Sequence, residues 1–249
     1  MIRFLSRHFL GTRGVDEFAI TAGMNWITQS TKLVDCGRGI EFESVSGPYR
    51  ELFVVEGDSA SQSVARSRDT RYQAVLPMQG KPMNAVKASR SSVRNNQWFD
   101  AFVAALGIGW NPADYRQTRY SRVLLLFDPD ADGIHCGALM LMFLERFFPG
   151  LLEQRRVSLI KAPMFQINGA TKGDHLYAAS EEHLRKIQDA LDAQSIPYTY
   201  QRYRGLASLG DQALVEHCLD PNSRTAYLMG MEDAAMARRV FCSGGKVRE

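Results

Sequence analysis

Short apolar runs separated by polar or helix-like stretches characterise the chain after about residue 50. Each run is rich in aliphatic or aromatic side chains, which is typical of buried strands. The runs predict strands at residues 51–55, 74–76, 123–127, 157–160, 164–167 and 198–201. The second run stops before Pro77, and the third ends at Asp128.

Periodic apolar positions predict helices between these strands. The apolar residues of 98–106 fall on one helical face. A second helix is expected from about Ile134 until Pro149, and a third begins at about Glu181, where Ser180 can cap it. Alternating strands and helices indicate an α/β fold with a mainly parallel sheet flanked by helices. In such sheets ligands bind beyond the carboxyl ends of the strands.

The composition is that of an ordinary globular protein. The chain has 249 residues, of which 45% are hydrophobic and 23% charged, and this excludes collagen-like, low-complexity and fully disordered classes. The most apolar stretch, residues 134–148, contains charged side chains and is shorter than the roughly 18 apolar residues of a membrane span. We therefore interpret it as a core helix, and expect no membrane association.

The predicted organisation has three parts. Residues 1–48 have weak periodicity and form an irregular N-terminal extension, residues 49–168 form the α/β domain, and residues 169–249 form a C-terminal lobe. The four cysteines never occur as Cys-x-x-Cys, which favours a reducing compartment, so a cytoplasmic location is expected. The arginines of the first fifteen residues leave a short targeting segment as an alternative.

Three carboxylates spaced by two residues form the sharpest local feature. Asp128, Asp130 and Asp132 precede Gly133, and oxygen ligands at this density suit a hard divalent cation, Mg²⁺ or Ca²⁺. An EF-hand loop is excluded because its twelfth position would be Leu139, which cannot ligate. A solvated acidic turn remains the alternative, since Asp and Gly are common in turns.

A second carboxylate stands at the end of another predicted strand. Glu56 is followed by Gly57, Asp58 and Ser59, small or polar residues that can open a helix. Such a glutamate could lie beside a metal or a phosphate and exchange protons. Helix capping by Asp58 or Ser59 explains the same residues equally well.

Positive charge is concentrated between these two features. The basic residues of the stretch are Arg66, Arg68, Arg71, Lys81, Lys87, Arg90 and Arg94. Asp69 is the one acid among them, whereas a solvated face usually mixes both signs. The net charge of the whole chain is only +3, so the asymmetry is local and favours contact with a nucleic-acid backbone.

Together these segments resemble the Toprim domain of type IIA DNA topoisomerase B subunits, the kind found in DNA gyrase and topoisomerase IV. The resemblance is carried, in the family's order, by residues 32–36 (KLVDC), 51–60 (ELFVVEGDSA), 76–81 (LPMQGK), Asn84, residues 87–88, residues 105–107, Asp128-x-Asp130-x-Asp132-Gly133-x-His135, residues 201–206 (QRYRGL) and 220–224 (DPNSR). It therefore extends from about residue 32 to about residue 225. It implies a Rossmann-like Toprim fold with a C-terminal tail of the B-subunit type.

The resemblance also implies roles for individual residues. Mg²⁺, or Mn²⁺ in its place, would be held by Glu56, Asp128 and Asp130, with Asp132 in support and Asp128 placed to bridge two ions. Catalytic roles would fall to Glu56, Lys81 and His135, although His135 could equally be a structural histidine at a helix start. The DNA contacts implied by the basic stretch and the tail are Arg66, Arg68, Lys81, Lys87 and Arg204.

The implied function is that of the Mg²⁺-binding subunit of a type II topoisomerase, inactive alone. Its expected partners are DNA, a tyrosine-bearing A-type subunit and a separate ATPase chain, because no nucleotide-binding loop is recognisable and no ATP site is expected here. Residues 61–62, Gln79, residues 136–137, Arg204 and residues 207–208 depart from the family pattern. A non-catalytic paralogue that regulates an A-type subunit is therefore the main alternative, and a Toprim nuclease or primase-like enzyme is a further one.

Overall fold

In the described part of the chain, the main sheet has five strands in the order β2-β1-β3-β4-β8. A computed structural model describes residues 32–37, 50–169 and 175–242, so most of the predicted N-terminal extension lies outside the described residues. The strands are β1 (Glu51–Glu56), β2 (Gln73–Met78), β3 (Arg122–Leu126), β4 (Val157–Ile160) and β8 (Ala226–Met229). The first four are mutually parallel, and β8 pairs antiparallel with β4, which confirms the predicted α/β class.

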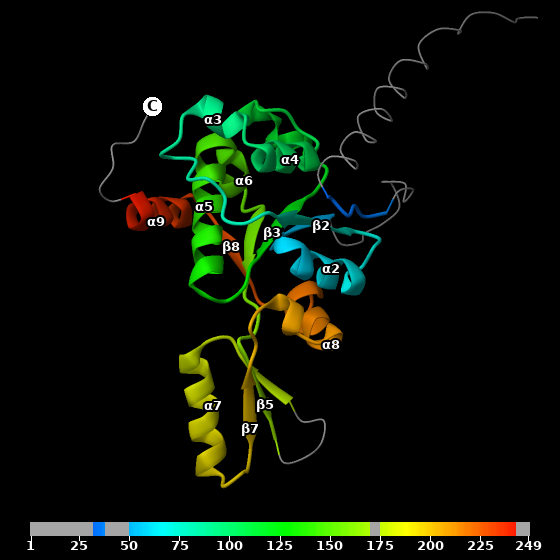
Figure 1. Cartoon of the computed structure of the whole chain (residues 1–249), viewed down its shortest axis with the longest axis vertical. Coiled ribbons are helices and arrows are strands. Elements are labelled where there is room, and N and C mark those ends of the chain that lie inside the picture. The colour runs from blue at the N-terminus through cyan, green and yellow to red at the C-terminus, as the bar shows by residue number, and fades with distance from the viewer. Residues whose placement is uncertain (1–31, 38–49, 170–174, 243–249) are drawn as a thin grey trace, which may run out of the picture.

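Helices cover both faces of this sheet (Figure 1). They are α2 (Gly57–Ser67), α3 (Arg90–Arg94), α4 (Gln97–Leu106), α5 (Ala131–Phe147), α6 (Pro149–Glu153), α8 (Asp211–Leu214) and α9 (Met231–Cys242). Short 3-10 segments lie at Pro112–Gln117 and Leu206–Ser208, and a π-helical turn at Val215–Leu219 follows α8. Successive residues of a strand point to opposite faces, so each apolar strand contributes to two separate cores.

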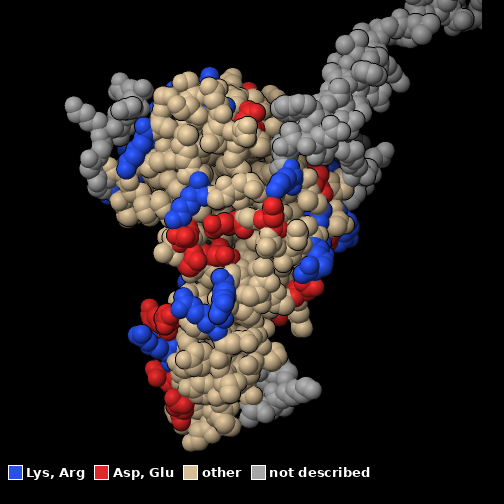
Figure 2. All heavy atoms as spheres, in the orientation of Figure 1, with Lys and Arg blue, Asp and Glu red and all other residues tan. Residues whose placement is uncertain are grey.

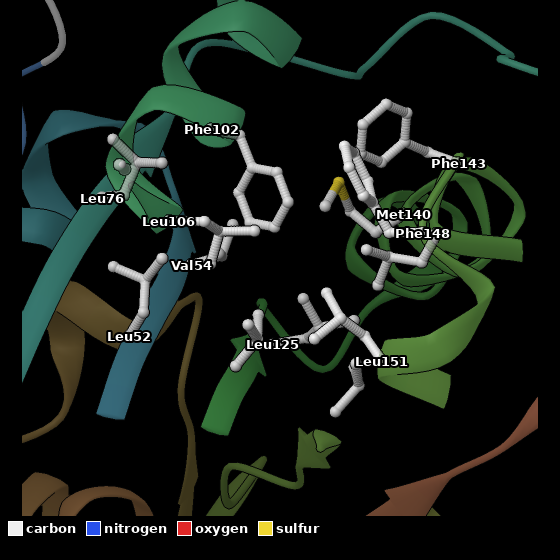
Figure 3. Packing of buried hydrophobic residues seen from close by; sticks show 14 of the residues in the cluster. Leu52, Val54, Leu76, Phe102, Leu106, Leu125, Met140, Phe143, Phe148 and Leu151 are labelled. Atoms are coloured by element: carbon white, nitrogen blue, oxygen red, sulfur yellow. The ribbon is translucent and has the colours of Figure 1, made fainter. Parts of the chain in front are cut away.

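The two cores divide the side chains of β1 between them. Leu52 and Val54 pack with the helices α3 to α6, whereas Phe53 and Val55 pack with α2 and α8 on the other face. Figure 3 shows Leu52, Val54 and Leu125 of the sheet facing the aromatic side chains of the first core. The rings of Phe99 in α4 and Phe143 in α5 stack with 4.1 Å between their centroids.

A smaller lobe extends from the main sheet between β4 and β8 (Figure 1). Its three-stranded antiparallel sheet has the order β6-β5-β7 and is packed against one helix. The elements are β5 (Phe165–Asn168), β6 (His175–Ala178), α7 (Glu181–Ala193) and β7 (Thr199–Arg202). The predicted cap is confirmed, because the Ser180 side chain accepts a hydrogen bond from the His183 amide.

The residues predicted to form one C-terminal lobe, 169–249, are divided between two parts of the structure. Residues 175–202 belong to the smaller lobe, whereas β8 and α9 return to the main sheet and to α5. The reason is that the β4 edge of the main sheet is completed by a strand from the end of the chain. The domain division itself stays a prediction.

Several element boundaries differ from the prediction by a few residues, and two of the differences have a clear physical cause. Pro77 lies inside β2 instead of ending it, because β2 is an edge strand, where a residue without an N–H donor is tolerated. Helix α5 begins at Ala131 rather than near Ile134, because the Asp130 side chain caps it by accepting from the Gly133 amide at 2.9 Å. Strands β6 and β8 and helix α9 were not predicted.

Residues 134–148 lie largely in α5 and are mostly buried, as expected for a core helix. Within the described part of the chain, no helix combines the length and the apolar character needed to cross a membrane. The four cysteines are free, and Cys36, Cys136 and Cys218 are buried. The cytoplasmic location stays a prediction.

Candidate functional site

The carboxylates predicted as site residues lie at the carboxyl ends of the parallel strands of the main sheet. Strands β1 and β3 are neighbours, with Val55 opposite Leu126, so the residues that follow them emerge side by side. Glu56 is the last residue of β1, and Asp128 lies in the loop after β3. The parallel sheet therefore brings together two carboxylates that are distant in sequence.

The loop after β3 is shaped by its glycine and by its capping aspartate. A Cβ atom at Gly133 would lie 1.9 Å from the carbonyl oxygen of Asp128, so no other residue fits this approach. The side chain of Asp130 caps α5 by accepting a hydrogen bond from the Gly133 amide. The Asp130 side chain nevertheless remains exposed to solvent. The Asp-x-Asp-x-Asp-Gly pattern thus specifies a tight entry into a buried helix.

Asp128 is the most enclosed carboxylate of this loop. Its Oδ1 atom accepts a hydrogen bond of 2.8 Å from the backbone amide of Leu206, which belongs to a distant segment. Burial raises the pKa of Asp128, the Leu206 hydrogen bond opposes this, and the charge of Asp130 adds to the rise. A solvated acidic turn therefore describes the exposed Asp130 and Asp132 but not Asp128.

Glu56 experiences the combined negative charge of the loop. Burial raises the pKa of Glu56, and the nearby carboxylates of Asp128, Asp130 and Asp132 raise it further. The ammonium group of Lys81 acts in the opposite direction. Glu56 is therefore a carboxylate whose charged form is disfavoured where it stands.

One lysine partly balances these four acids. The Nζ atom of Lys81 lies 2.7 Å from Oδ1 of Asp132, and both side chains are about half exposed. Figure 2 shows acidic side chains gathered near the centre of one face, with basic side chains above and below them. Four carboxylates with one lysine leave excess negative charge, and an all-oxygen donor set of this kind fits a hard divalent cation.

The carboxylates do not close around a single point. Among the described residues, no group of three or more His, Cys, Asp or Glu side chains is arranged to hold a metal ion. Asp128, Asp130 and Asp132 instead have three different hydrogen-bond donors, namely Leu206, Gly133 and Lys81. The donor chemistry fits Mg²⁺, and the exposed side chain of Asp130 would need to turn toward Asp128 and Glu56 to enclose it.

Asp58 does not cap α2, so the capping interpretation of Asp58 or Ser59 is wrong. The N-cap residue of α2 is Glu56, and no side chain forms a capping hydrogen bond there. The carboxylate of Asp58 instead forms an ion pair of 2.8 Å with Lys32 and accepts a hydrogen bond of 2.9 Å from Gln79. These partners hold the side chain of Asp58 away from the helix amides.

The basic candidates fall into two groups. Lys81, Lys87 and Arg204 are exposed. Arg66 pairs with Asp211 at 2.9 Å, and the guanidinium group of Arg68 donates to the backbone carbonyls of Ala65, Gln73 and Asp35. Both of these arginines lie at or beyond the far end of α2, away from Glu56.

His135 lies within the first turns of α5 and is half-buried. Its ring stacks on Phe241 of α9, with 4.8 Å between the centroids. The contact joins α5 to the C-terminal helix, which favours the structural interpretation of this histidine over a catalytic one.

Sequence reasoning did not single out Lys32, Gly205 or Leu206 as site residues. Lys32 reaches Asp58, and Gly205 and Leu206 contact Asp128. Residues 32–36 and 201–206 each form a recognisable motif, but neither motif revealed a contact with the carboxylates of the site.

Carboxylates at the ends of neighbouring parallel strands define an α/β domain of the kind whose ligands bind beyond the carboxyl ends of its strands. The family model described as "Toprim domain" matches residues 51–162, which include the acidic loop and Glu56. The chain is 34% identical over 211 residues to the DNA gyrase B subunit of Archaeoglobus fulgidus, covering 84% of this chain and 32% of that protein. The corresponding protein of Thermotoga maritima is 33% identical over 211 residues, covering 84% and 32%.

The DNA gyrase B subunit of Mycoplasmoides gallisepticum is 31% identical over 226 residues, which cover 86% of this chain and 34% of that protein. The chain thus spans about a third of the length of the curated relatives that it matches. It carries a Toprim domain of the type IIA DNA topoisomerase B-subunit family, as the motifs indicated.

Proposed function

We propose that this chain is the Mg²⁺-binding Toprim subunit of a type II DNA topoisomerase, which supports DNA cleavage and religation with a tyrosine-bearing A-type partner. The observation that carries the proposal is that Glu56 ends β1 and the Asp128 loop follows the neighbouring strand β3, so that the two lie side by side inside a domain of the Toprim family. Mn²⁺ would substitute for Mg²⁺. An ATPase component would complete the assembly.

Glu56, Asp128 and Asp130 would hold the metal, and Asp132 would support them from outside the coordination sphere. When bound, Mg²⁺ supplies neutralisation of the scissile phosphate and of the leaving oxygen. Hard cations prefer oxygen ligands, and all four side chains are carboxylates. Burial and, after it, repulsion by the three aspartates raise the pKa of Glu56, and this repulsion is a further argument for a cation at this place.

Glu56 would also move a proton during the reaction. A carboxylate positioned beside the reacting oxygens can act as a general base and then as a general acid. It would accept the proton of the attacking hydroxyl and return it for religation. Lys81 would remain beside Asp132 or turn its ammonium group to a phosphate, because it is exposed.

DNA would follow exposed basic residues, of which Lys81 and Arg204 lie close to the acidic loop. Lys81, Lys87 and Arg204 support this path, because their side chains are exposed. Arg68 contributes less to this argument, because its guanidinium group donates to backbone carbonyls within the protein. Arg66 is exposed, but it pairs with Asp211 at the far end of α2, away from Glu56. Non-specific contact of this kind uses charge and not base identity.

A second candidate function is that of a non-catalytic regulator that binds an A-type subunit. Gln79 stands where the family usually has a basic residue, and its amide donates to Asp58. An uncharged side chain at this position would weaken DNA contact. The carboxylates needed for metal binding remain, however, so we favour the catalytic function.

The test is a DNA cleavage assay with the chain, its A-type subunit and Mg²⁺. The wild-type chain is expected to give breaks with protein joined to the 5′ ends. Glu56→Gln should suppress these breaks while the complex still forms, because the change retains volume and removes only charge and proton transfer. Glu153→Gln is the matched control, since Glu153 is an exposed carboxylate of α6.

The regulator gives a different result. It would form the complex without breaks, and lower the activity of the resident topoisomerase equally with or without Glu56→Gln. That outcome would replace the catalytic function by the second candidate. Absence of any complex would contradict both.

A further inference from the structure

The chain passes from the smaller lobe directly to the acidic loop. After β7, the Tyr203 amide donates to the Met164 carbonyl at 2.8 Å, which joins the outgoing segment to the incoming one. Three residues later the side chain of Leu206 enters the core beneath the main sheet, where it is 1% exposed. The backbone at Leu206 is thus anchored by its own side chain.

A serine closes the turn that contains Gly205. The Ser208 hydroxyl donates to the Gly205 carbonyl at 2.6 Å, and it accepts from the Arg204 amide at 3.1 Å. These bonds fix the turn without using the Leu206 amide. The Leu206 amide therefore remains free to donate to Asp128. Its direction is fixed by the buried Leu206 side chain and by the hydrogen bonds of Ser208.

Gly205 and Leu206 together contact both oxygens of the Asp128 carboxylate. Leu206 donates to Oδ1, and a Cβ atom at Gly205 would lie 2.6 Å from Oδ2 and 3.1 Å from Oδ1. The first of these distances is shorter than any normal contact, so a side chain at position 205 must displace the carboxylate or the turn. The backbone of Gly205 is extended, and the requirement for glycine is therefore steric.

We propose that Gly205 and Leu206 are positioning residues for the metal centre: the turn holds Asp128 in one orientation through the Leu206 amide and leaves space for its carboxylate at Gly205. This inference rests on the proposed function. A carboxylate oxygen that accepts one amide keeps further lone pairs for a cation. Hydrogen-bond partners of metal ligands typically change metal affinity by about 10–100-fold when they are lost.

The test measures Mn²⁺ binding to the whole chain without DNA, from the paramagnetic resonance signal of free Mn²⁺. Gly205→Ala is expected to weaken Mn²⁺ binding by about 10–100-fold. Gly210→Ala is the matched control, because a Cβ atom there meets nothing within 4 Å and the residue belongs to the same segment. It should bind Mn²⁺ like the wild type. The melting temperature without metal separates loss of affinity from loss of fold.

A second variant covers the case in which Gly205→Ala does not fold. A backbone ester at Leu206, introduced with the α-hydroxy analogue of leucine, removes the N–H donor and keeps the buried side chain. It is expected to weaken Mn²⁺ binding in the same direction. Folded variants with wild-type affinity for Mn²⁺ would overturn this inference alone, whereas a wild-type chain that binds no Mn²⁺ would overturn the proposed function as well.

Discussion

The guanidinium group of Arg224 donates two hydrogen bonds to the carboxylate of Glu51, and the two side chains are only 2% and 3% exposed. Glu51 is the first residue of β1, and Arg224 ends the Asp220–Arg224 motif just before β8. The side-chain amide of Gln73 donates to the same carboxylate at 3.0 Å. The ion pair therefore ties the beginning of the main sheet to the returning end of the chain.

Loss of Arg224 should destabilise the protein strongly. Arg224→Ala leaves Glu51 buried without a counter-charge, and the expected loss in the free energy of unfolding is about 3–5 kcal/mol. Urea unfolding measures it. Arg122→Ala, an exposed arginine of β3, is the control and should change stability by less than about 0.5 kcal/mol. A comparable small effect for both variants would contradict a structural role of the pair.

Acid stability should depend on Asp35. Burial by itself would raise the pKa of Asp35, but the Tyr120 hydroxyl, which donates at 2.6 Å, and the Arg119 guanidinium lower it overall. The stabilisation is therefore complete above the unfolded pKa of about 3.9 and is lost as the pH falls through the lower folded value. Asp35→Asn should lower stability at neutral pH and flatten the dependence on pH below about 4.

The measurement is urea unfolding of both proteins at a series of pH values. Asp189→Asn, on the exposed surface of α7, serves as the control. Parallel stability curves for the wild type and Asp35→Asn through the acid range would refute the role of the Tyr120 and Arg119 contacts.

Mg²⁺ should stabilise the folded chain. At a concentration of 100 times its Kd, a ligand that binds only the native state adds about 2.7 kcal/mol. Asp128→Ala should remove this increment, whereas Asp189→Ala should keep it. Thermal unfolding with and without Mg²⁺ measures both. A wild-type melting temperature that ignores Mg²⁺ would count against the site.

Glu56→Gln should stabilise the metal-free protein at neutral pH while it weakens the response to Mg²⁺. The folded pKa of Glu56 is raised, so its charged form costs stability above that pKa. The advantage of Gln should shrink as the pH falls through the folded pKa, and vanish below the unfolded value of about 4.3. Unfolding at several pH values in the presence of a chelator tests this. An advantage of Gln that grows on acidification would contradict the sign of the shift.

DNA binding should be sensitive to salt. If about four phosphates are contacted, the slope of log affinity against log salt should be roughly −3.6, and Lys87→Ala should make it shallower by about 0.9. Arg68→Ala should lower stability and leave the slope unchanged, because its guanidinium group binds backbone carbonyls. Fluorescence anisotropy of a labelled duplex, with the A-type subunit present, gives the slopes. Binding that ignores salt would remove this interpretation.

The parallel strands and the acidic loop were predictable because their signals are local. An apolar run that ends in Glu56 or before Asp128 reports both the strand and the position of the carboxylate at its end. Neighbouring parallel strands then bring those ends together without further information. The boundary at Ala131 was missed only because the capping role of Asp130 was not recognised.

Contacts between distant segments were not predictable. The basic stretch could not reveal that Arg66 pairs with Asp211, 145 positions further along the chain. Strand β8 escaped because its residues are mostly exposed and form no buried apolar run. The hydrogen bond from Leu206 to Asp128 comes from a backbone amide, which every residue except proline carries and which leaves no mark in the sequence.

The hydrogen bond from the Tyr203 amide to the Met164 carbonyl makes the smaller lobe a closed loop on a narrow neck. Its outgoing and incoming segments are adjacent there, and residues 165–202 contribute no strand to the main sheet. The ring of Tyr177 in β6 also contacts His217, with 4.3 Å between the centroids. A reporter domain grafted into the lobe away from Tyr177 is therefore expected to leave the pairing of the main-sheet strands unchanged.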